Sequence, residues 1–200
     1  MPLINSVVQW LNFKRIYQIQ LYREHPLEIQ AETLFRLVNS ARETEWGKTH
    51  GFDKIDNFSD FQSSMPLQTY DDIKLYVERL REGEKNVLWP GEVRWFAKSS
   101  GTTSDKSKFI PVTKESLEEC HLRGPKDVFA QYLKNYPDSK VLKVKILTLG
   151  GSHRVNRSDN NSIYGDLSAI MIENVPFWAD FVRTLSAEIA LIEEFEEKIE

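Results

Sequence analysis

The sequence has one cysteine, no long apolar run and no excess of positive charge, and each of these absences excludes a class of protein. One cysteine, Cys120, excludes an intrachain disulfide framework and fits a reducing compartment. No apolar run approaches the roughly 20 residues that span a bilayer, and Gln9, Asn12 and Lys14 interrupt the stretch where a signal peptide would have its core. A net charge of −4 implies no basic face for nucleic acid. We therefore expect a cytoplasmic protein that binds neither nucleic acid nor membrane.

The remaining composition is that of an ordinary globular protein, and its apolar spacing alternates between helix and strand. Two hundred residues, 40% of them hydrophobic, suffice for one domain or one and a half with a sizeable core. Helical spacing predicts helices over 3–23, from Pro26 to a turn at 47–51, over 69–83, over 113–137 with an interruption at 124–125, and from 184 onward. Strands are expected at 87–89, 93–96, 109–112 and 141–149, with a short apolar run at 168–172. This alternation predicts the α/β class.

Several local signals refine these expectations. Thr69 is a candidate N-cap, and Asp71 and Asp72 complement the positive end of the helix that follows it; the alternative is that the two carboxylates form a metal or acid/base pair. Residues 56–67 are expected to form a loop anchored by two phenylalanines. Cys120 is expected to point inward as a core residue.

The most informative stretch runs from Ser99 to Lys108. Its ten residues contain six hydroxyl side chains, one glycine and two lysines, and strand-like sequence flanks it on both sides. Small residues allow the backbone to approach a ligand closely, and hydroxyls, free N–H groups and lysine suit phosphate oxygens. A polar hairpin loop is the alternative, because turns are also rich in such residues. The second glycine of a Walker loop is missing, so a P-loop ATPase is a poor match.

The flanking segments extend this pattern into a family resemblance. The stretch 95–103, continuing to 108–113, closely resembles the auxin-responsive acyl-acid amido synthetase family, in a bacterial-type form, of the acyl-adenylate-forming, luciferase-like superfamily. Further segments that resemble this family occur in the correct order at 44–52, 65–67, 70–72, 86–91, 165–168 and 197–200.

The resemblance implies the N-terminal part of a large adenylate-forming domain, with helices packed on a mixed β-sheet. Residues 1–85 would be a helical lead-in and 86–200 the phosphate-loop α/β region. The later motifs and the C-terminal domain are expected beyond Glu200, so the 200 residues alone are expected to be inactive.

The implied activity consumes ATP with Mg²⁺. A small carboxylic acid would be activated as an acyl-adenylate and then joined to the amine of an amino acid. The alternatives are an acyl-CoA ligase of the same superfamily and a non-catalytic phosphate-binding scaffold.

The resemblance also assigns site residues. The residues expected to hold the β- and γ-phosphates are Ser99, Ser100, Gly101, Thr102 and Thr103, with Lys108 at the end of the loop. Asp105 departs from the pattern, where such loops commonly carry glycine, and we expect its side chain to point outward. Arg123 is a candidate for the acyl-acid pocket, with a surface charge as the alternative.

Other candidates carry weaker signals. His50, His121 and His153 are each either catalytic or structural, and His153 follows two glycines. The acidic run at 193–197 is expected to be a solvated helix face. No metal ligand and no catalytic residue is assigned.

Overall fold

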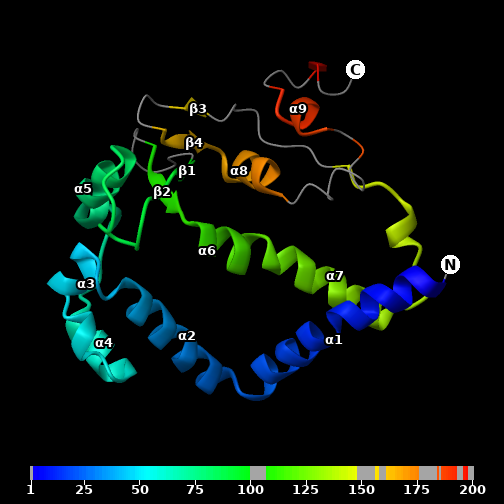
Figure 1. Cartoon of the computed structure of the whole chain (residues 1–200), viewed down its shortest axis with the longest axis horizontal. Helices are drawn as coiled ribbons and strands as arrows, with labels where there is room; N and C mark the ends of the chain where they lie inside the picture. Colours follow the sequence, from blue (N-terminus) through cyan, green and yellow to red (C-terminus); the bar gives the residue numbers. More distant parts are fainter. Residues whose placement is uncertain are drawn as a thin grey trace. The chain divides into compact units, whose positions relative to one another are not determined.

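The computed structural model describes residues 2–99, 107–147, 156–157, 161–175, 184, 186–192 and 196–197 (Figure 1). Its contacts divide the chain into two compact units, each built from separate stretches of sequence. Unit 1 comprises Met1–His25, Glu115–Arg154 and Ser168–Glu200, and unit 2 comprises Pro26–Lys114 and Val155–Leu167. Within the described ranges, none of the helices combines the length and the apolar character that a membrane crossing requires.

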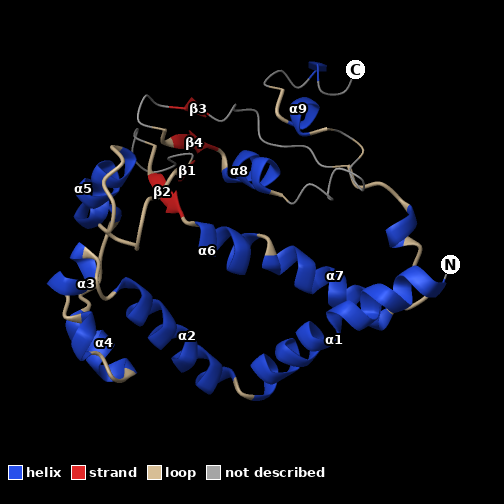
Figure 2. Cartoon of the chain, in the orientation of Figure 1, coloured by secondary structure: helices blue, strands red, loops and turns tan. Residues whose placement is uncertain are grey.

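Unit 2 contains a four-stranded mixed sheet (Figure 2). Its strands are β1 (Trp95–Lys98), β2 (Phe109–Val112), β3 (Asn156–Arg157) and β4 (Ile163–Gly165), in the order β2-β1-β4-β3. β1 is antiparallel to β2 and parallel to β4, and β3 is antiparallel to β4. The predicted α/β class and mixed sheet are therefore confirmed, as are the predicted strand at 109–112 and the second half of the one at 93–96.

Helix α5 (Tyr70–Arg81) packs its apolar stripe on this sheet. Val77 and Leu80 on the helix and Phe96 on β1 are completely buried in one cluster with Val87 and Val93. The residues that begin and end α5 are those that the sequence predicted. The Asp72 carboxylate accepts hydrogen bonds from the Thr69 N–H and hydroxyl, both at 2.7 Å, and the Gly83 N–H donates to the Leu80 carbonyl at a positive φ of 90°.

The segment between α2 (Pro26–Ala41) and α5 is more helical than predicted. The expected turn at 47–51 contains the short helix α3 (Glu45–Thr49), followed by the 3₁₀ turn Phe52–Lys54. The expected loop at 56–67 is wrong, since α4 (Phe58–Ser64) occupies most of it. Asn57 supports this helix as its N-cap, because its side-chain oxygen accepts from the Asp60 N–H at 3.0 Å.

The strand expected at 87–89 is also wrong, because these residues form bends. Backbone carbonyls of this segment accept hydrogen bonds from α3 and not from a neighbouring strand. The carbonyls of Asn86 and Val87 accept from the N–H groups of Glu45 and Trp46, at 2.9 and 3.0 Å. These donors belong to the first turn of α3, where no intrahelical acceptor exists. The Gly91 N–H donates to the Asn86 side chain at 2.7 Å and closes the segment into a turn. Two of the family-like segments, 44–52 and 86–91, thus bind each other.

Unit 1 is built on the pairing of α1 (Pro2–Glu24) with α7 (Arg123–Asn135). The Arg15 guanidinium donates to both carboxylate oxygens of Asp127, at 2.7 and 2.6 Å, and this bidentate pair fixes one helix against the other. The described part of the unit also contains most of α8 (Leu167–Asn174) and the short α9 (Ala187–Ala190). The helix predicted at 3–23 is confirmed. Of the helix predicted from 184 onward, the structure describes mainly α9.

Two expectations in unit 1 are wrong. Cys120 is exposed, because α6 (Lys114–Ser116) leads into a π-helical turn, Leu117–His121, in which the Leu122 N–H reaches back five residues to the Leu117 carbonyl. The wider turn changes which positions face inward, so Leu117 is buried and Cys120 is not. Of the buried strand expected at 141–149, the structure describes residues 141–147, and these form a 3₁₀ turn, Val141–Lys143, followed by a stretch in which Val144, Ile146 and Leu147 are exposed.

Candidate nucleotide-phosphate site

The β1–β2 hairpin fixes both ends of the hydroxyl-rich loop. Lys98 pairs with Phe109 in the ladder, and one position further the Ser99 N–H donates to the Lys108 carbonyl at 2.9 Å. The two ends of the loop are therefore held one backbone hydrogen bond apart. Of the predicted phosphate-binding residues, the structure describes Ser99, which is half-buried, and Lys108, which is exposed. The other four, together with Asp105, lie outside the described residues: Ser100, Gly101, Thr102 and Thr103.

Tyr70 anchors the returning end of this loop to the first turn of α5. Its phenol oxygen accepts a hydrogen bond from the Phe109 N–H at 3.0 Å, and the Lys108 ammonium lies 5.5 Å from the centre of its ring. Lys108 is thereby held by a cation–π contact on an aromatic ring that is itself fixed to the hairpin. Sequence analysis missed this role, because it used Tyr70 only as part of a helix start and of a family-like segment.

Arg81, at the other end of α5, places a second cation against the sheet. Its guanidinium carbon lies 3.7 Å from the centre of the Phe109 ring and 5.8 Å from that of Tyr164, and these two rings meet edge to face. The Ser162 hydroxyl donates to the Arg81 carbonyl and so ties the end of the helix to the residue before β4. The local sequence around Arg81 carries no signal for these contacts.

The parallel pairing of β1 with β4 defines the edge of the sheet at which the loop begins. Ala97 is the register partner of Gly165, so the segment that leaves β1 at Ser99 and the segment that leaves β4 at Asp166 start from the same edge. Ligands of open α/β sheets bind outside the carboxyl ends of parallel strands. The family-like segment that begins at Gly165 therefore starts beside the hydroxyl-rich loop, although the two are far apart in sequence.

Asp72, one of the two carboxylates in the first turn of α5, acts as a capping group. Two hydrogen bonds from Thr69 lower the pKa of Asp72, because they stabilise its charged form. The bond from the Thr69 hydroxyl has the larger effect and the bond from the backbone N–H the smaller one. Among the residues that the structure describes, no three His, Cys, Asp or Glu side chains are grouped in a way that could hold a metal ion. These observations favour the capping interpretation of Asp71 and Asp72 over the metal interpretation.

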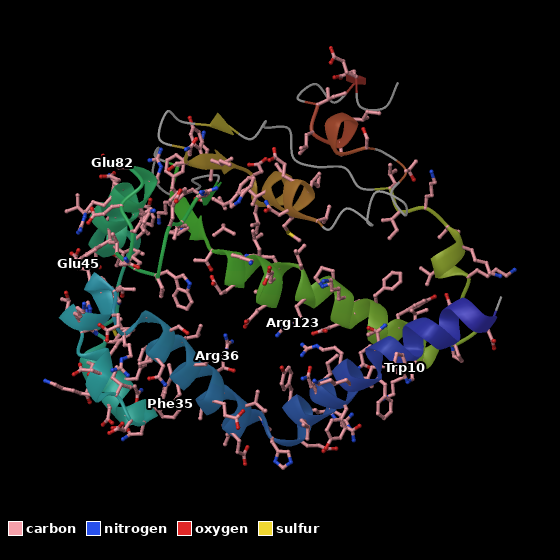
Figure 3. The ribbon with its side chains drawn as sticks, viewed as in Figure 1. Trp10, Phe35, Arg36, Glu45, Glu82 and Arg123 are labelled. Atoms are coloured by element: carbon pink, nitrogen blue, oxygen red, sulfur yellow. The ribbon has the colours of Figure 1, made fainter. Side chains whose placement is uncertain are left out.

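The other candidates are not brought to the loop by the described contacts. The Nδ1 atom of His50 lies 2.9 Å from the Trp46 carbonyl, and the two rings stack with centres 4.0 Å apart, so His50 helps to hold the end of α3. His121 is half-buried in the π-helical turn, and His153 lies outside the described residues. Arg123 is the first residue of α7 in unit 1, whereas the hairpin belongs to unit 2 (Figure 3). Its place in an acyl-acid pocket stays a prediction.

An ionic cluster on the outer side of α5 joins three parts of unit 2. Arg79 donates to both oxygens of Glu45, at 2.8 and 2.6 Å, and to both oxygens of Glu84, at 2.7 and 2.5 Å (Figure 3 labels Glu45 on α3). These hydrogen bonds hold the pKa of Glu45 and of Glu84 below the ordinary value of a glutamate. The cluster links the start of α3 to the end of α5.

This cluster predicts a pH-dependent contribution to stability. Because the folded-state pKa values of the two glutamates are lowered, the contribution is complete above about pH 4.5, their ordinary pKa, and is lost as the pH falls through the folded values. We expect Arg79→Met to lower the thermal unfolding midpoint by a few degrees at pH 7, and the difference from the parent chain to shrink toward zero near pH 3. Thermal unfolding between pH 3 and 7 measures it. Lys54→Met, an exposed charge removal in the same unit, is the control, and a difference that does not depend on pH would contradict the prediction.

Comparison with known proteins identifies the family. Residues 15–200 match the GH3 family N-terminal domain. A jasmonoyl–L-amino acid synthetase of Nicotiana attenuata, JAR4, is 32% identical over 93 residues, which are 46% of this chain and 16% of the relative. The indole-3-acetic acid-amido synthetase GH3.6 of Arabidopsis thaliana is 29% identical over 96 residues, or 48% of this chain and 16% of the relative.

Solved structures agree in fold. The GH3.15 acyl acid amido synthetase superposes with a TM-score of 0.70 at 20% sequence identity, over 86% of this chain and 30% of that protein. The AtGH3.15 acyl acid amido synthetase in complex with 2,4-DB gives 0.66 at 20% identity, over 84% and 29%. The matches to curated relatives thus span about a sixth of those proteins. The resemblance found in the sequence is confirmed, and the chain belongs to the GH3 family through its N-terminal domain.

Proposed function

We propose that this chain forms the N-terminal, triphosphate-binding part of an ATP-dependent acyl-acid amido synthetase. The observation that carries the proposal is the hairpin, in a GH3-family chain, that holds both ends of the hydroxyl-rich loop at the carboxyl edge of the parallel pair β1 and β4. Relatives named as jasmonoyl- and indole-3-acetic acid-amido synthetases support an amide product and not a thioester. Residues 1–85 are the helical lead-in of this proposal and 86–200 its phosphate-loop region.

The proposed reaction has two steps. A carboxylate oxygen of the acyl acid attacks the α-phosphorus of ATP, and pyrophosphate leaves with the electron pair of the broken P–O bond. The amine of an amino acid then attacks the carbonyl carbon of the acyl-adenylate, AMP leaves, and the amine loses a proton. The first step converts a poor electrophile into a good one, so the protein mainly needs to position the groups and to stabilise charge.

The loop residues supply that stabilisation in the proposal. The hydroxyls of Ser99, Ser100, Thr102 and Thr103 and the backbone N–H of Gly101 donate to the β- and γ-phosphate oxygens, where negative charge increases as pyrophosphate leaves. Lys108 adds a positive charge. Fixed loop ends favour catalysis, because donors that are already held in place need little reorganisation during the reaction.

Other parts of the site are assigned to segments beyond these residues. The described residues offer no carboxylate cluster for Mg²⁺, so we propose it only as the ion that accompanies ATP, and no step is assigned to it. The remaining nucleotide motifs would come from the rest of a GH3 protein. Arg123 would contribute to the acyl-acid pocket, and the cytoplasm suits a chain with a single, exposed cysteine.

Acid-dependent ATP–pyrophosphate exchange tests the proposal. The protein that carries this chain together with the remaining GH3 segments is incubated with labelled pyrophosphate, ATP and a panel of aliphatic, benzoic, indole-type and cyclopentanone carboxylic acids. We expect exchange with at least one acid, and a mass-detected amide once amino acids are added. A folded protein that exchanges with none of the acids would refute adenylation, whereas a thioester formed with coenzyme A in place of an amide would refute the second step.

A further inference from the structure

The peptide group between Lys108 and Phe109 is held from both sides at the point where the hydroxyl-rich loop joins β2. Its carbonyl accepts a hydrogen bond from the Ser99 N–H at 2.9 Å, and its N–H donates to the phenol oxygen of Tyr70 at 3.0 Å. The C=O and N–H of a trans peptide point in opposite directions, so the two bonds together prevent this group from rotating. The backbone that carries Lys108 therefore has a fixed orientation.

Tyr70 supplies the acceptor that the sheet does not provide for this N–H. In the order β2-β1-β4-β3, β2 lies at one edge of the described sheet, and α5 lies beside it (Figure 1). Because the Lys108 carbonyl points toward β1, the Phe109 N–H points away from the ladder. Edge strands leave such groups without a ladder partner. A side chain of α5 takes the place of the missing strand, at the first residue after Lys108.

The ring of Tyr70 also holds the other end of Lys108. The Nζ atom of Lys108 lies 5.5 Å from the centre of this ring, which is within the range of a cation–π contact. A lysine ammonium is carried on a flexible stem of four carbons, so a contact at its end decides where the charge is placed. The phenol oxygen acts on the backbone and the ring acts on the ammonium, so one residue fixes both ends of Lys108.

Tyr70 is itself held in place by the start of α5. It is the first residue of the helix and follows the N-cap Thr69, whose N–H and hydroxyl both donate to the Asp72 carboxylate at 2.7 Å. At the last residue of the helix, the Arg81 guanidinium carbon lies 3.7 Å from the centre of the Phe109 ring. Helix α5 thus contacts the backbone of Phe109 from one end and its ring from the other. A supporting residue places a functional group accurately only when it is itself fixed in this way.

We propose that Tyr70 is a positioning residue for Lys108 in the adenylation step, an inference that rests on the proposed function. Its oxygen and its ring together place the Lys108 ammonium where negative charge increases as pyrophosphate leaves. Several loop groups share the phosphates of bound ATP, so a displaced ammonium lowers the rate more than it lowers the affinity for ATP. Tyr70 acts through Lys108 and needs no contact with the substrate of its own.

A double-mutant cycle in ATP–pyrophosphate exchange tests the proposal, in the protein that carries this chain together with the remaining GH3 segments. Tyr70→Phe keeps the ring and removes the oxygen, and we expect the maximal exchange rate to fall about tenfold while the KM for ATP changes less than about threefold. Tyr70→Leu removes both contacts, and a loss of about 50-fold is expected. In a Lys108→Met background, Tyr70→Phe should change the rate less than about twofold, because the residue through which it acts is gone.

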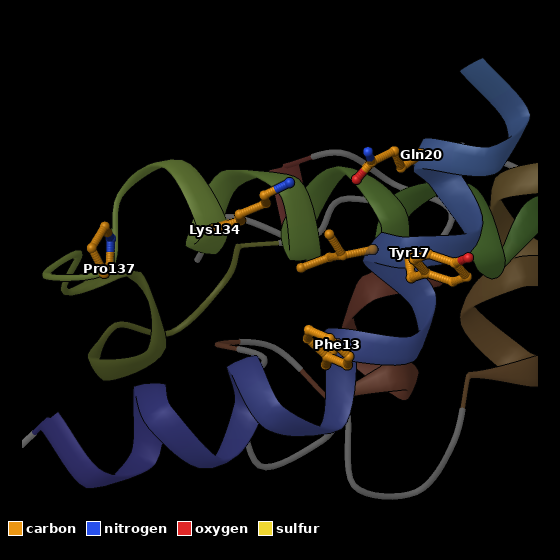
Figure 4. A pocket seen from close by; sticks show the side chains of 6 residues that line it. Phe13, Tyr17, Gln20, Lys134 and Pro137 are labelled. Atoms are coloured by element: carbon orange, nitrogen blue, oxygen red, sulfur yellow. The ribbon is translucent and has the colours of Figure 1, made fainter. Parts of the chain in front are cut away.

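Two tyrosines outside the loop provide matched controls. Tyr76 lies on the same helix and meets Trp46 edge to face. Tyr17 lies on α1 in unit 1, where it lines a groove together with Phe13 (Figure 4). Tyr76→Phe and Tyr17→Phe each remove a phenol oxygen that has no described contact with the loop, and both should leave the exchange rate and the KM for ATP unchanged.

The outcomes distinguish this proposal from the proposed function. If the parent protein exchanges and Tyr70→Phe lowers the rate by the same factor with and without Lys108, Tyr70 supports the loop as a whole and its role through Lys108 is refuted. Equal rates for the parent and Tyr70→Phe would refute it as well. A parent protein that exchanges with none of the acids would refute adenylation, and the role of Tyr70 with it. Unfolding midpoints show which variants fold, and the conservative Tyr70→Phe decides the question if Tyr70→Leu does not.

Discussion

Changing Ser100 and Thr102 together to alanine is expected to lower ATP–pyrophosphate exchange about 100-fold or more, while the thermal unfolding midpoint stays within about 2 °C of the parent protein. The two hydroxyls are proposed donors to phosphate oxygens whose charge increases in the transition state, so their loss should reduce the rate at saturating ATP as well as the affinity. The hairpin itself does not depend on them, because the ladder from Lys98 to Phe109 and the bonds of Ser99 and Tyr70 close it from outside the substituted positions. Exchange kinetics and thermal unfolding of the same preparations measure both effects.

A matched control shows whether the loss of exchange comes from removing hydroxyls in the loop or from removing a threonine and a serine hydroxyl anywhere on the surface. Thr33 and Ser63 are an exposed threonine and serine whose hydroxyls donate to carbonyls of their own helices, at 2.8 and 2.9 Å. Thr33→Ala with Ser63→Ala should leave exchange unchanged. If the loop variant instead lost several degrees of stability and kept its exchange rate, the loop would be an ordinary polar hairpin turn, which is the alternative that its composition allows.

Elements whose signals are local in sequence were predicted well. Helix α5 is the best example, since its cap at Thr69, its stripe at Val77 and Leu80 and its stop at Gly83 lie within fifteen residues of one another. Helix α4 was missed although Asn57 is a good cap, because its serine-rich composition is also typical of loops. The strand predicted at 87–89 was wrong for a non-local reason: the carbonyls of Asn86 and Val87 bind α3, about forty residues earlier, and nothing in the sequence of the segment itself shows this.

The candidate site also has a part that the sequence could predict and a part that it could not. The loop could be found because glycine and hydroxyl residues in a row suit phosphate, and because flanking segments resemble a family. The residues that hold the loop could not be found, since Tyr70 is 39 positions from its partner Phe109 and Arg81 is 81 positions from Ser162. Only the packing of α5 on the sheet brings these groups together. The prediction that Cys120 points inward was wrong, because a π-helical turn changes the number of residues per turn. Apolar spacing alone does not reveal such a turn.

Gly47→Ala is expected to produce the largest loss of stability, about 3 kcal/mol or more, or about 6–12 °C in the unfolding midpoint. A Cβ atom at this position would lie 2.2 Å from the carbonyl oxygen of Ala41 and 2.9 Å from the Cα of Arg42, so it would meet backbone and not a flexible side chain. The approach is close because the buried Thr44 hydroxyl donates to the Ala41 carbonyl at 2.6 Å and accepts from the Gly47 N–H at 3.0 Å. The methyl group therefore forces apart the end of α2 and the start of α3, and thermal unfolding measures the cost.

Two other glycines provide controls for the loss of stability. Gly51→Ala tests the effect of backbone strain without crowding, and Gly124→Ala tests the effect of helix propensity without either. Gly51→Ala adds a Cβ that meets no atom within 4 Å but sits at a φ of 61°, so a loss of only about 1 kcal/mol is expected. Gly124→Ala, in the first turn of α7, also meets nothing and has no positive φ, and a gain of up to about 1 kcal/mol is expected. If Gly47→Ala cost no more than Gly51→Ala, the contact between α2 and α3 would be loose enough to admit a methyl group. The larger loss at Gly47 would mean that this family-like segment keeps its glycine because the end of α2 packs against the start of α3 with no room for a methyl group.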